Sequence, residues 1–362
     1  MQKWERIQGV YIHTPFCLQK CLYCDFASYA GADTETMEKY VDAVCSEIMM
    51  RSNEMTIADQ ATLYFGGGTP SLLSAKLLAK LVEALQKNGC WLQPEEATIE
   101  VNPGTADLDK LRFFKDLGFD RISFGVQSLN DAELRAVGRI HTANEALDAI
   151  TMAEKAGFTR VSADLIYGLP EQSLQTLKTN TPLAGLLDKG KVELPDEDCQ
   201  LAMYELVQEY LEAQGLHRYE ISNYAVSGQE SRHNLVYWHY LPYLSFGSSA
   251  CSFNGSQRFT ATDSVTDYIE SIQSGKSCGG FEDLTKEMQL SEYLFMGLRT
   301  AVGIDLIETE QRFGCDIMLE FGVELEKFIR GNLVFCDIEH RRMRLTEQGM
   351  RFSNEIFEIF VK

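Results

Sequence analysis

Short runs of β-branched and aromatic residues alternate with longer amphipathic stretches through the first half of the chain. The stretch 34–51, for example, carries apolar residues at the spacing of one helix face. Alternation of strands with helices is typical of a parallel sheet with crossover helices. The predicted strands are 9–13, 61–65 and 97–101, followed by two more near 121 and 160.

The last two predicted strands lie in an internal repeat. Gly-Phe-Asp-Arg-Ile-Ser at 118–123 recurs as Gly-Phe-Thr-Arg-Val-Ser at 157–162. Repetition of one β/α unit implies similar packing around the sheet. We therefore predict an α/β fold with a partial (β/α) barrel of the TIM type.

A glycine-rich turn, Gly-Gly-Gly-Thr-Pro at 66–70, follows the second predicted strand. Thr69 suits the N-cap of the next helix, and Pro70 suits its first position. The glycines let a ligand approach the backbone closely. The turn lacks the Gly-Lys-Ser ending of a nucleotide-binding P-loop, and taken alone it is equally well a tight strand-to-helix turn.

The alternation fails near Asn180, where no sixth strand follows the expected helix. Either the chain lacks that strand or the sequence omits a piece beside Thr181. A helix over 196–214 leads into an aromatic-rich region, which we expect to form strands and loops that cover the open side of the core. Helices over 285–299, 306–312 and 320–330, a hairpin over 333–345 and a last helix predict a small C-terminal domain.

Composition and charge narrow the class of protein. The 362 residues are 45% hydrophobic, enough for a large core. A formal charge of −20 repels phosphates, so nucleic acid is not an expected partner. No apolar run reaches transmembrane length, and the ten cysteines do not suggest a secreted disulfide framework. We predict a cytoplasmic protein that is not integral to a membrane.

Three cysteines, Cys17, Cys21 and Cys24, lie in one short loop with the spacing C-x3-C-x2-C. Thiolates this close repel one another unless a soft cation neutralises them, which favours an iron–sulfur cluster or zinc. A four-iron cluster held by three cysteines has one iron with a free coordination position. A structural zinc with His13 as fourth ligand, and ordinary buried thiols, are the alternatives.

This loop resembles the defining motif of the radical S-adenosylmethionine (SAM) superfamily, and Tyr23 before the third cysteine fits it. The sequence around the loop resembles one branch of this superfamily, which contains the oxygen-independent coproporphyrinogen III oxidases (HemN) and the HemW haem chaperones. The resemblance is carried by the motifs Tyr-x-His-x-Pro-Phe-Cys and Tyr-Cys-Asp-Phe, and it is greatest for HemW. The oxidases carry a fourth cysteine where this chain has Phe26. The resemblance implies that the three cysteines hold a [4Fe–4S] cluster.

The resemblance also implies a SAM site at the carboxyl ends of the strands. From residue type and position, Glu100 and Asp164 could accept hydrogen bonds from ribose, and Arg139 could hold a carboxylate. Each is equally well a satisfied polar residue or a member of a surface ion pair. By similarity, the cofactor contacts fall at Tyr11, Gly67, Gly68, Thr69, Glu100, Gln127, Arg139 and Asp164.

The sequence His-Asn-Leu-Val-Tyr at 233–237 bears on haem. Histidine and tyrosine are known axial haem ligands, although chemistry alone favours aromatic core here. Related chains resemble one another in an H-N-x-x-Y motif implicated in haem binding, and His233 and Tyr237 match it. Cys251 stands where relatives usually carry a histidine, so its role stays open.

Together the resemblances imply a haem chaperone that binds a cluster, SAM and haem, and delivers haem to acceptors such as respiratory cytochromes. The alternatives are a coproporphyrinogen III oxidase and a zinc-stabilised structural protein. Enzymatic activity is not assigned, and a homodimer is left open. The expected domains are a radical SAM core over 1–180, a barrel-covering region over 181–280 and a winged-helix-like, HemN-type domain over 281–362.

Overall fold

The computed structural model describes residues 4–52, 55–91, 94–169, 197–337 and 339–361. The chain divides into two compact units. The first comprises Met1–Val207, Tyr243–Ser252 and Phe259–Gly280, and the second Gln208–Pro242, Phe253–Arg258 and Phe281–Lys362. The prediction that a strand or a piece of sequence is missing near Asn180 and Thr181 concerns residues outside those described. The division into three domains stays a prediction.

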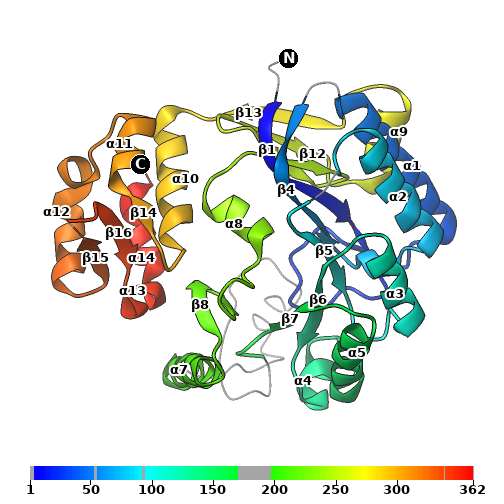
Figure 1. The fold of residues 1–362 in the computed structure, drawn as a ribbon, viewed down its shortest axis with the longest axis horizontal. Coiled ribbons are helices and arrows are strands. Elements are labelled where there is room, and N and C mark those ends of the chain that lie inside the picture. The colour runs from blue at the N-terminus through cyan, green and yellow to red at the C-terminus, as the bar shows by residue number, and fades with distance from the viewer. Residues whose placement is uncertain (1–3, 53–54, 92–93, 170–196, 338, 362) are drawn as a thin grey trace, which may run out of the picture. The chain divides into compact units, whose positions relative to one another are not determined.

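A nine-stranded sheet is the main feature of the fold (Figure 1). Its strands are β1 (Trp4–Thr14), β4 (Met55–Gly67), β5 (Ala97–Val101), β6 (Arg121–Gln127), β7 (Arg160–Leu165), β10 (Tyr243–Phe246), β11 (Cys251–Phe253), β12 (Gln257–Ala261) and β13 (Gly279–Asp283). Their order is β13-β12-β11-β10-β1-β4-β5-β6-β7. The strands from β10 and β1 through β7 pair in parallel. This mixed α/β fold around a parallel sheet confirms the predicted fold class.

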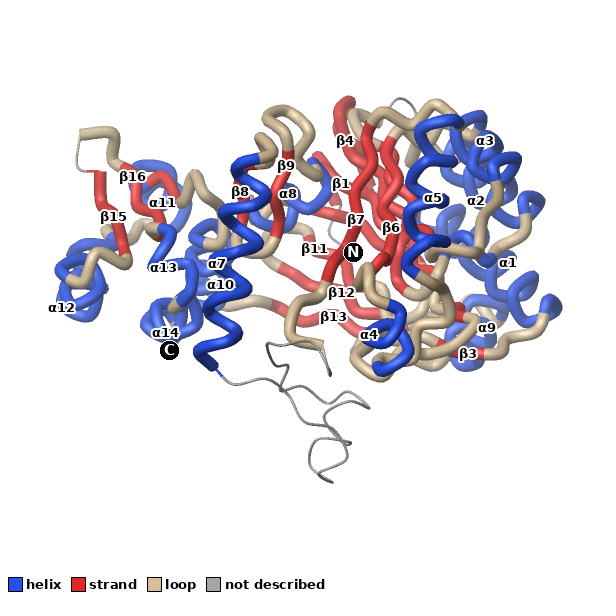
Figure 2. The backbone as a smooth tube through the Cα atoms, turned by 90° about the horizontal axis from the view of Figure 1, so that it is seen from below, coloured by secondary structure: helices blue, strands red, loops and turns tan. Residues whose placement is uncertain are grey.

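Helices α1, α2, α3 and α5 cover one face of the sheet (Figure 2). The helical elements of the first unit are α1 (Thr34–Arg51), η2 (Pro70–Leu72), α2 (Ala75–Lys87), α3 (Leu108–Asp116), α4 (Asp131–Ala136), α5 (Ala143–Lys155) and α9 (Val265–Gln273). Two short strands, β2 (Phe16–Cys17) and β3 (Tyr29–Ala30), flank the cysteine loop. The strand and helix limits agree closely with those predicted for 34–51 and 97–101.

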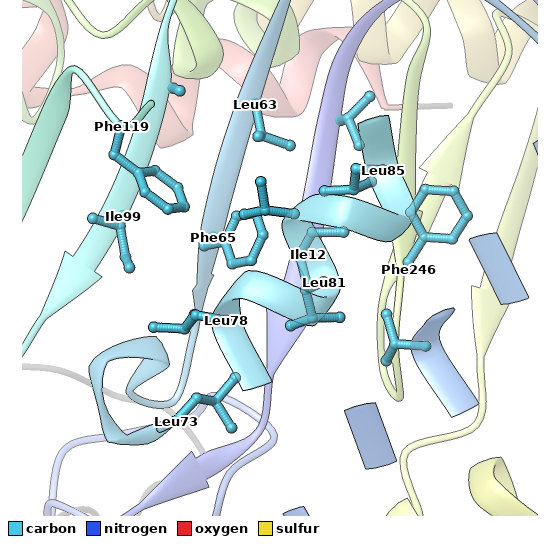
Figure 3. Packing of buried hydrophobic residues seen from close by; sticks show 14 of the residues in the cluster. Ile12, Leu63, Phe65, Leu73, Leu78, Leu81, Leu85, Ile99, Phe119 and Phe246 are labelled. Carbon is cyan, nitrogen blue, oxygen red and sulfur yellow. The ribbon is translucent and has the colours of Figure 1, made fainter. Parts of the chain in front are cut away.

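The helix-covered face is apolar because side chains alternate between the two faces of each strand. Ile12, Phe65 and Ile99 come from three neighbouring strands and are fully buried. They pack with Leu78 and Leu81 of α2, as Figure 3 shows. Burial of each such side chain contributes about 1.5–3 kcal/mol. The other face of the same strands is left for polar residues.

The helix after β4 begins later than predicted. Pro70–Leu72 form a 3-10 turn, and α2 begins at Ala75, where the Ser74 hydroxyl accepts a hydrogen bond from Leu77 N. Thr69 precedes the turn but makes no capping hydrogen bond. Its buried hydroxyl has other partners, which are described with the site below.

The aromatic-rich region also differs from the prediction. Strand β10 pairs with β1, and β11 to β13 continue the sheet beyond it, whereas we expected strands and loops across the open side. The sequence did not predict helix α8 (Arg232–Trp238), which the Ser231 hydroxyl caps by accepting a hydrogen bond from Asn234 N. Strands β8 (His217–Glu220) and β9 (Asn223–Ala225) form an antiparallel pair.

The C-terminal part of the second unit confirms the predicted helices and hairpin. Its final helix is broken into short segments. The elements are α10 (Lys286–Leu298), β14 (Ile304–Asp305), α11 (Leu306–Phe313), α12 (Ile317–Arg330), β15 (Val334–Asp337), β16 (Arg342–Leu345), α13 (Glu347–Arg351), α14 (Ser353–Phe357) and η3 (Glu358–Phe360). Helix α7 (Glu197–Ala213) spans the boundary between the two units. Within the described ranges, no helix combines the length and the apolar character needed to cross a membrane.

A buried carboxylate ties α1 to the sheet within the first unit. Glu47 is 1% exposed and forms an ion pair of 2.7 Å with Arg51. The Tyr268 hydroxyl donates to Glu47 Oε2 at 2.6 Å, and the backbone N–H of Gly247 donates to the same oxygen at 3.0 Å. The Arg51 guanidinium lies 5.2 Å from the ring centre of Phe246. Every oxygen of this carboxylate is therefore used.

We expect Glu47→Ala to lower the free energy of unfolding by about 3–5 kcal/mol, because it leaves Arg51 without its buried partner. Glu35→Ala is the matched control on the same helix, since Glu35 pairs with Lys39 at the surface. Surface pairs contribute about 0–1 kcal/mol. Urea unfolding of both variants measures the difference, and equal losses would contradict this account of Glu47.

Candidate functional site

Polar side chains occupy the face of the sheet that the helices leave uncovered. Tyr11 and Tyr64 are register partners on β1 and β4, and their rings stack with centres 6.0 Å apart. The Tyr64 hydroxyl donates to Glu100 Oε1 at 2.6 Å. On β6 and β7, the Ser123 hydroxyl lies 3.4 Å from Asp164 Oδ1. Parallel strands thus bring these side chains to one surface.

Two carboxyl groups on this face have raised pKa values. Burial raises the pKa of Glu100 to about 7, although the Tyr64 hydroxyl and the Gly67 N–H both donate to it. Burial also raises the pKa of Asp164, with Ser123 opposing the shift. Although Asp164 lies on the edge strand β7 and is exposed to solvent, the protein atoms around its carboxyl group still raise the pKa. Both groups are suited to accept hydrogen bonds from a ligand.

The glycines of the 66–70 turn are needed for close packing against the protein itself. A Cβ on Gly67 would lie 2.5 Å from the His13 ring, and the residue has φ +108°. A Cβ on Gly68 would lie 2.7 Å from Phe16 O. The turn therefore packs against the segment that leads into the cysteine loop. This agrees with the interpretation as a tight turn, while the interpretation as a ligand site stays a prediction.

His13 joins β1 to the far end of the cysteine loop. The Ala27 carbonyl can only accept, so His13 Nε2 donates to it at 3.0 Å, and His13 Nδ1 accepts from the Tyr11 hydroxyl at 3.1 Å. Burial lowers the pKa of His13, in agreement with a neutral ring. Both ring nitrogens of His13 are therefore used by hydrogen bonds within the protein.

Across the ranges that the structure describes, no three His, Cys, Asp or Glu side chains are placed to hold a single metal ion. The three loop cysteines are free thiols of intermediate exposure.

Hydrogen bonds hold the middle of the cysteine loop. Cys17 ends β2, and the turn that follows is closed by Cys24 N donating to Cys21 O at 3.2 Å. Leu22 N donates to Val137 O at 3.0 Å, and Gln19 Nε2 donates to the Gly138 carbonyl at 3.1 Å. The segment after α4 thus holds the middle of the loop.

Side-chain donors reach two of the three sulfur atoms. The Thr69 hydroxyl donates to Cys17 Sγ at 3.7 Å, and Arg139 Nη1 donates to Cys21 Sγ at 3.5 Å. Burial raises the pKa of Cys17, the Thr69 hydroxyl opposes this, and the charges of Cys24 and Cys21 raise it further. The three thiols therefore lie within electrostatic reach of one another. A soft cluster with hydrogen-bonded sulfur ligands fits this donor set.

Arg139 also approaches the end of β6. A Cβ on Gly125 would lie 3.3 Å from Arg139 Nη2 and 3.0 Å from Gln127 Nε2. The Nε of Arg139 is buried and has no hydrogen-bond partner among the described residues. A partly buried guanidinium with an unused donor is suited to hold an anionic ligand group.

The first unit therefore brings together most of the residues predicted from the sequence. These are Tyr11, Cys17, Cys21, Cys24, Gly67, Gly68, Thr69, Glu100, Gln127, Arg139 and Asp164. His233 and Tyr237 lie in the second unit. Cys251 lies on β11, where its sulfur is 3.6 Å from the Thr260 hydroxyl.

His233 and Tyr237 contact each other on α8. His233 Nε2 lies 2.9 Å from the Tyr237 hydroxyl, and the two rings meet edge to face with centres 5.1 Å apart. His233 is 1% exposed, and burial lowers its pKa to about 3. The imidazole is therefore neutral, which is the form that binds metals.

Sequence reasoning missed Tyr64, Ser123 and Asn102 as members of the site. Alternation along the predicted strands places Tyr64 and Ser123 on the same face as Glu100 and could have found them. Asn102 begins an Asn-Pro-Gly sequence, which locally favours a turn. Nothing in the local sequence signals its contacts, because these come from segments far away in the chain.

Comparison with known proteins defines the class. Residues 11–179 match the model of the Radical SAM superfamily, and residues 284–352 match that of the HemN C-terminal domain. The chain is 32% identical to the heme chaperone HemW of Bacillus subtilis, with 98% of this chain and 99% of the relative covered. It is 31% identical to HemW of Lactococcus lactis, with 99% and 98% covered. The chain belongs to the HemW family of radical SAM proteins.

A solved structure agrees on the fold. The chain is similar to the coproporphyrinogen III oxidase HemN of Escherichia coli, a radical SAM enzyme, with a TM-score of 0.83. The match covers 99% of this chain and 91% of that one at 22% sequence identity. At this identity the likeness shows the shared architecture.

The raised pKa of Glu100 predicts a pH dependence of stability. The pKa of Glu100 is about 7 in the folded protein against 4.5 ordinarily. Between these two pH values, the native state keeps a proton that the unfolded chain releases. The free energy of unfolding therefore falls as pH rises through the window, by about 3 kcal/mol from this group. Glu100→Gln should remove that part of the fall in urea unfolding measured across the window. The exposed Glu35→Gln is the control, and parallel curves for Glu100→Gln and the parent protein would contradict the assignment.

Proposed function

We propose that this chain is a cytoplasmic haem chaperone that binds a [4Fe–4S] cluster, SAM and haem, and delivers haem to acceptor proteins such as respiratory cytochromes. Relatives named heme chaperones, similar over nearly the whole chain, support this proposal. The observation that carries it is the cysteine loop, whose thiols meet donors from Thr69 and Arg139 beside a polar sheet face. The exposed Phe26 stands where the oxidases are expected to carry a further cysteine.

Cys17, Cys21 and Cys24 would hold the cluster. Such a cluster, when bound, would supply an electron and an open coordination position for SAM. Arg139 has an unused Nε donor for the carboxylate of SAM, and Glu100 and Asp164 provide oxygens for its hydroxyl groups. The full set of proposed SAM contacts is Tyr11, Gly67, Gly68, Thr69, Glu100, Gln127, Arg139 and Asp164.

We assign His233 and Tyr237 to haem binding. A neutral imidazole and a phenol are both established haem ligands. His233 Nε2 and the Tyr237 hydroxyl share a hydrogen bond in this structure, so coordination of haem iron by His233 Nε2 would replace that bond. Their spacing of one helical turn keeps both side chains on one face of α8.

Anaerobic reconstitution should give a brown protein with about four irons per chain. Cys24→Ser should lose most of this iron because only two ligands remain. Cys336→Ser, which changes a free cysteine of the second unit, should retain it. Iron analysis and visible absorption measure the outcome. A colourless protein with one zinc would refute the cluster.

Haem titration tests the second assignment. His233→Ala should abolish or shift the haem absorption band and weaken binding at least tenfold, since loss of a metal ligand or its support costs about 10–100-fold. His239→Ala is the matched control, because His239 follows the same helix and is exposed. An unaltered spectrum of His233→Ala would remove His233 as ligand. Decarboxylation of coproporphyrinogen in a reduced assay with SAM would instead favour the oxidase.

A further inference from the structure

We propose that Asn102 positions the hydrogen-bond donors of two cluster cysteines and thereby raises the reduction potential of the [4Fe–4S] cluster. The inference rests on the proposed cluster. Asn102 acts through Arg139 and Thr69, so its role is that of a positioning residue. It follows directly after β5, where Thr105 N donates to the Asn102 carbonyl at 3.0 Å and fixes the turn.

One amide links the two donors. Arg139 Nη2 donates to Asn102 Oδ1 at 2.9 Å, while Asn102 Nδ2 donates to Thr69 Oγ1 at 2.9 Å. Arg139 Nη1 then donates to Cys21 Sγ at 3.5 Å, and the Thr69 hydroxyl donates to Cys17 Sγ at 3.7 Å. A continuous chain of hydrogen bonds therefore joins two of the three sulfurs through Asn102.

The direction of this chain follows from chemistry. A guanidinium can only donate, so the Asn102 atom that faces Arg139 is the oxygen, and the NH2 group faces Thr69. Thr69 oxygen accepts from that NH2 group, which leaves the hydroxyl proton to point at Cys17. Thr69 is 1% exposed, so solvent has little access to compete for its hydroxyl.

The absence of a side chain at Gly125 leaves room for these hydrogen bonds. A Cβ on Gly125 would lie 3.1 Å from Asn102 Oδ1 and 3.3 Å from Arg139 Nη2. The Gly125 carbonyl also accepts a hydrogen bond from Arg139 Nη2. Strand β6 therefore fixes the guanidinium from one side while Asn102 fixes it from the other.

Donors at cluster sulfurs stabilise the reduced cluster more than the oxidised one, because reduction adds negative charge to the sulfurs. Asn102→Asp keeps the oxygen that Arg139 needs but replaces the NH2 group with an acceptor. The Thr69 proton would turn to that carboxylate and away from Cys17. Asn102→Leu, which is similar in size and uncharged, removes both contacts.

The test is an EPR-monitored redox titration of the reconstituted protein without SAM. We expect both variants to bind as much iron as the parent chain. At a fixed applied potential, their ratio of reduced to oxidised cluster should fall about tenfold, which is about 59 mV for a one-electron couple. Thr69→Val should lower the midpoint potential in the parent chain and have a smaller effect in the Asn102→Leu background.

Asn130→Asp controls for the added charge. Asn130 caps α4 with its side-chain oxygen, and aspartate keeps that role. A shift in Asn102→Asp no larger than in Asn130→Asp, or an unchanged potential in Asn102→Leu, would overturn the proposal. If Asn102→Leu fails to fold, the comparison of the near-isosteric Asn102→Asp with Asn130→Asp decides the question. Absence of a cluster in the parent chain would instead refute the proposed function, so the two failures are distinguishable.

Discussion

The structure depends on a parallel sheet that is apolar on one face and polar on the other. Parallel strands are usually buried on both faces and read as continuous apolar runs. Here each strand alternates, so that Ile12, Phe65 and Ile99 face the helices while Tyr64 and Glu100 face away from them. Polar groups in such a place must find partners within the protein or in a ligand, because an unsatisfied buried polar group is costly. Side chains on neighbouring strands supply many of these partners, as Tyr64 does for Glu100. The hydrogen-bond donors and acceptors that stay unused are available to a cofactor.

The two faces are mechanically connected. The Tyr40 hydroxyl, on the helix side, donates to the His13 carbonyl at 2.9 Å and accepts from Ser248 N at 3.0 Å. The His13 ring, on the polar side, holds both Tyr11 and the Ala27 end of the cysteine loop. The packing that stabilises the sheet therefore also determines where the loop begins and ends. A loop with three thiols needs such support, because its own side chains form no core.

The fold alone does not separate a haem chaperone from a porphyrin oxidase. The whole chain matches the oxidase HemN in architecture, while its sequence places it in the HemW family. Function must then be argued from local sites. In this chain the local features that bear on the proposed function are Phe26 beside the cysteine loop and the His233–Tyr237 pair on α8.

The sequence by itself determined the local elements and the residue types of the site. Helix α1, strand β5, the repeated β/α unit and the cysteine spacing all follow from patterns within a few turns of chain. Tertiary structure decided the rest. Thr69 looks like a helix cap locally, yet its hydroxyl lies between Asn102 and Cys17, and α2 is capped by Ser74 instead. Asn102 looks like a turn residue, yet it connects Thr69 with Arg139. Such roles depend on contacts between segments that are distant in sequence, which no local pattern encodes, because a side chain's partner is chosen only when the strands are packed side by side.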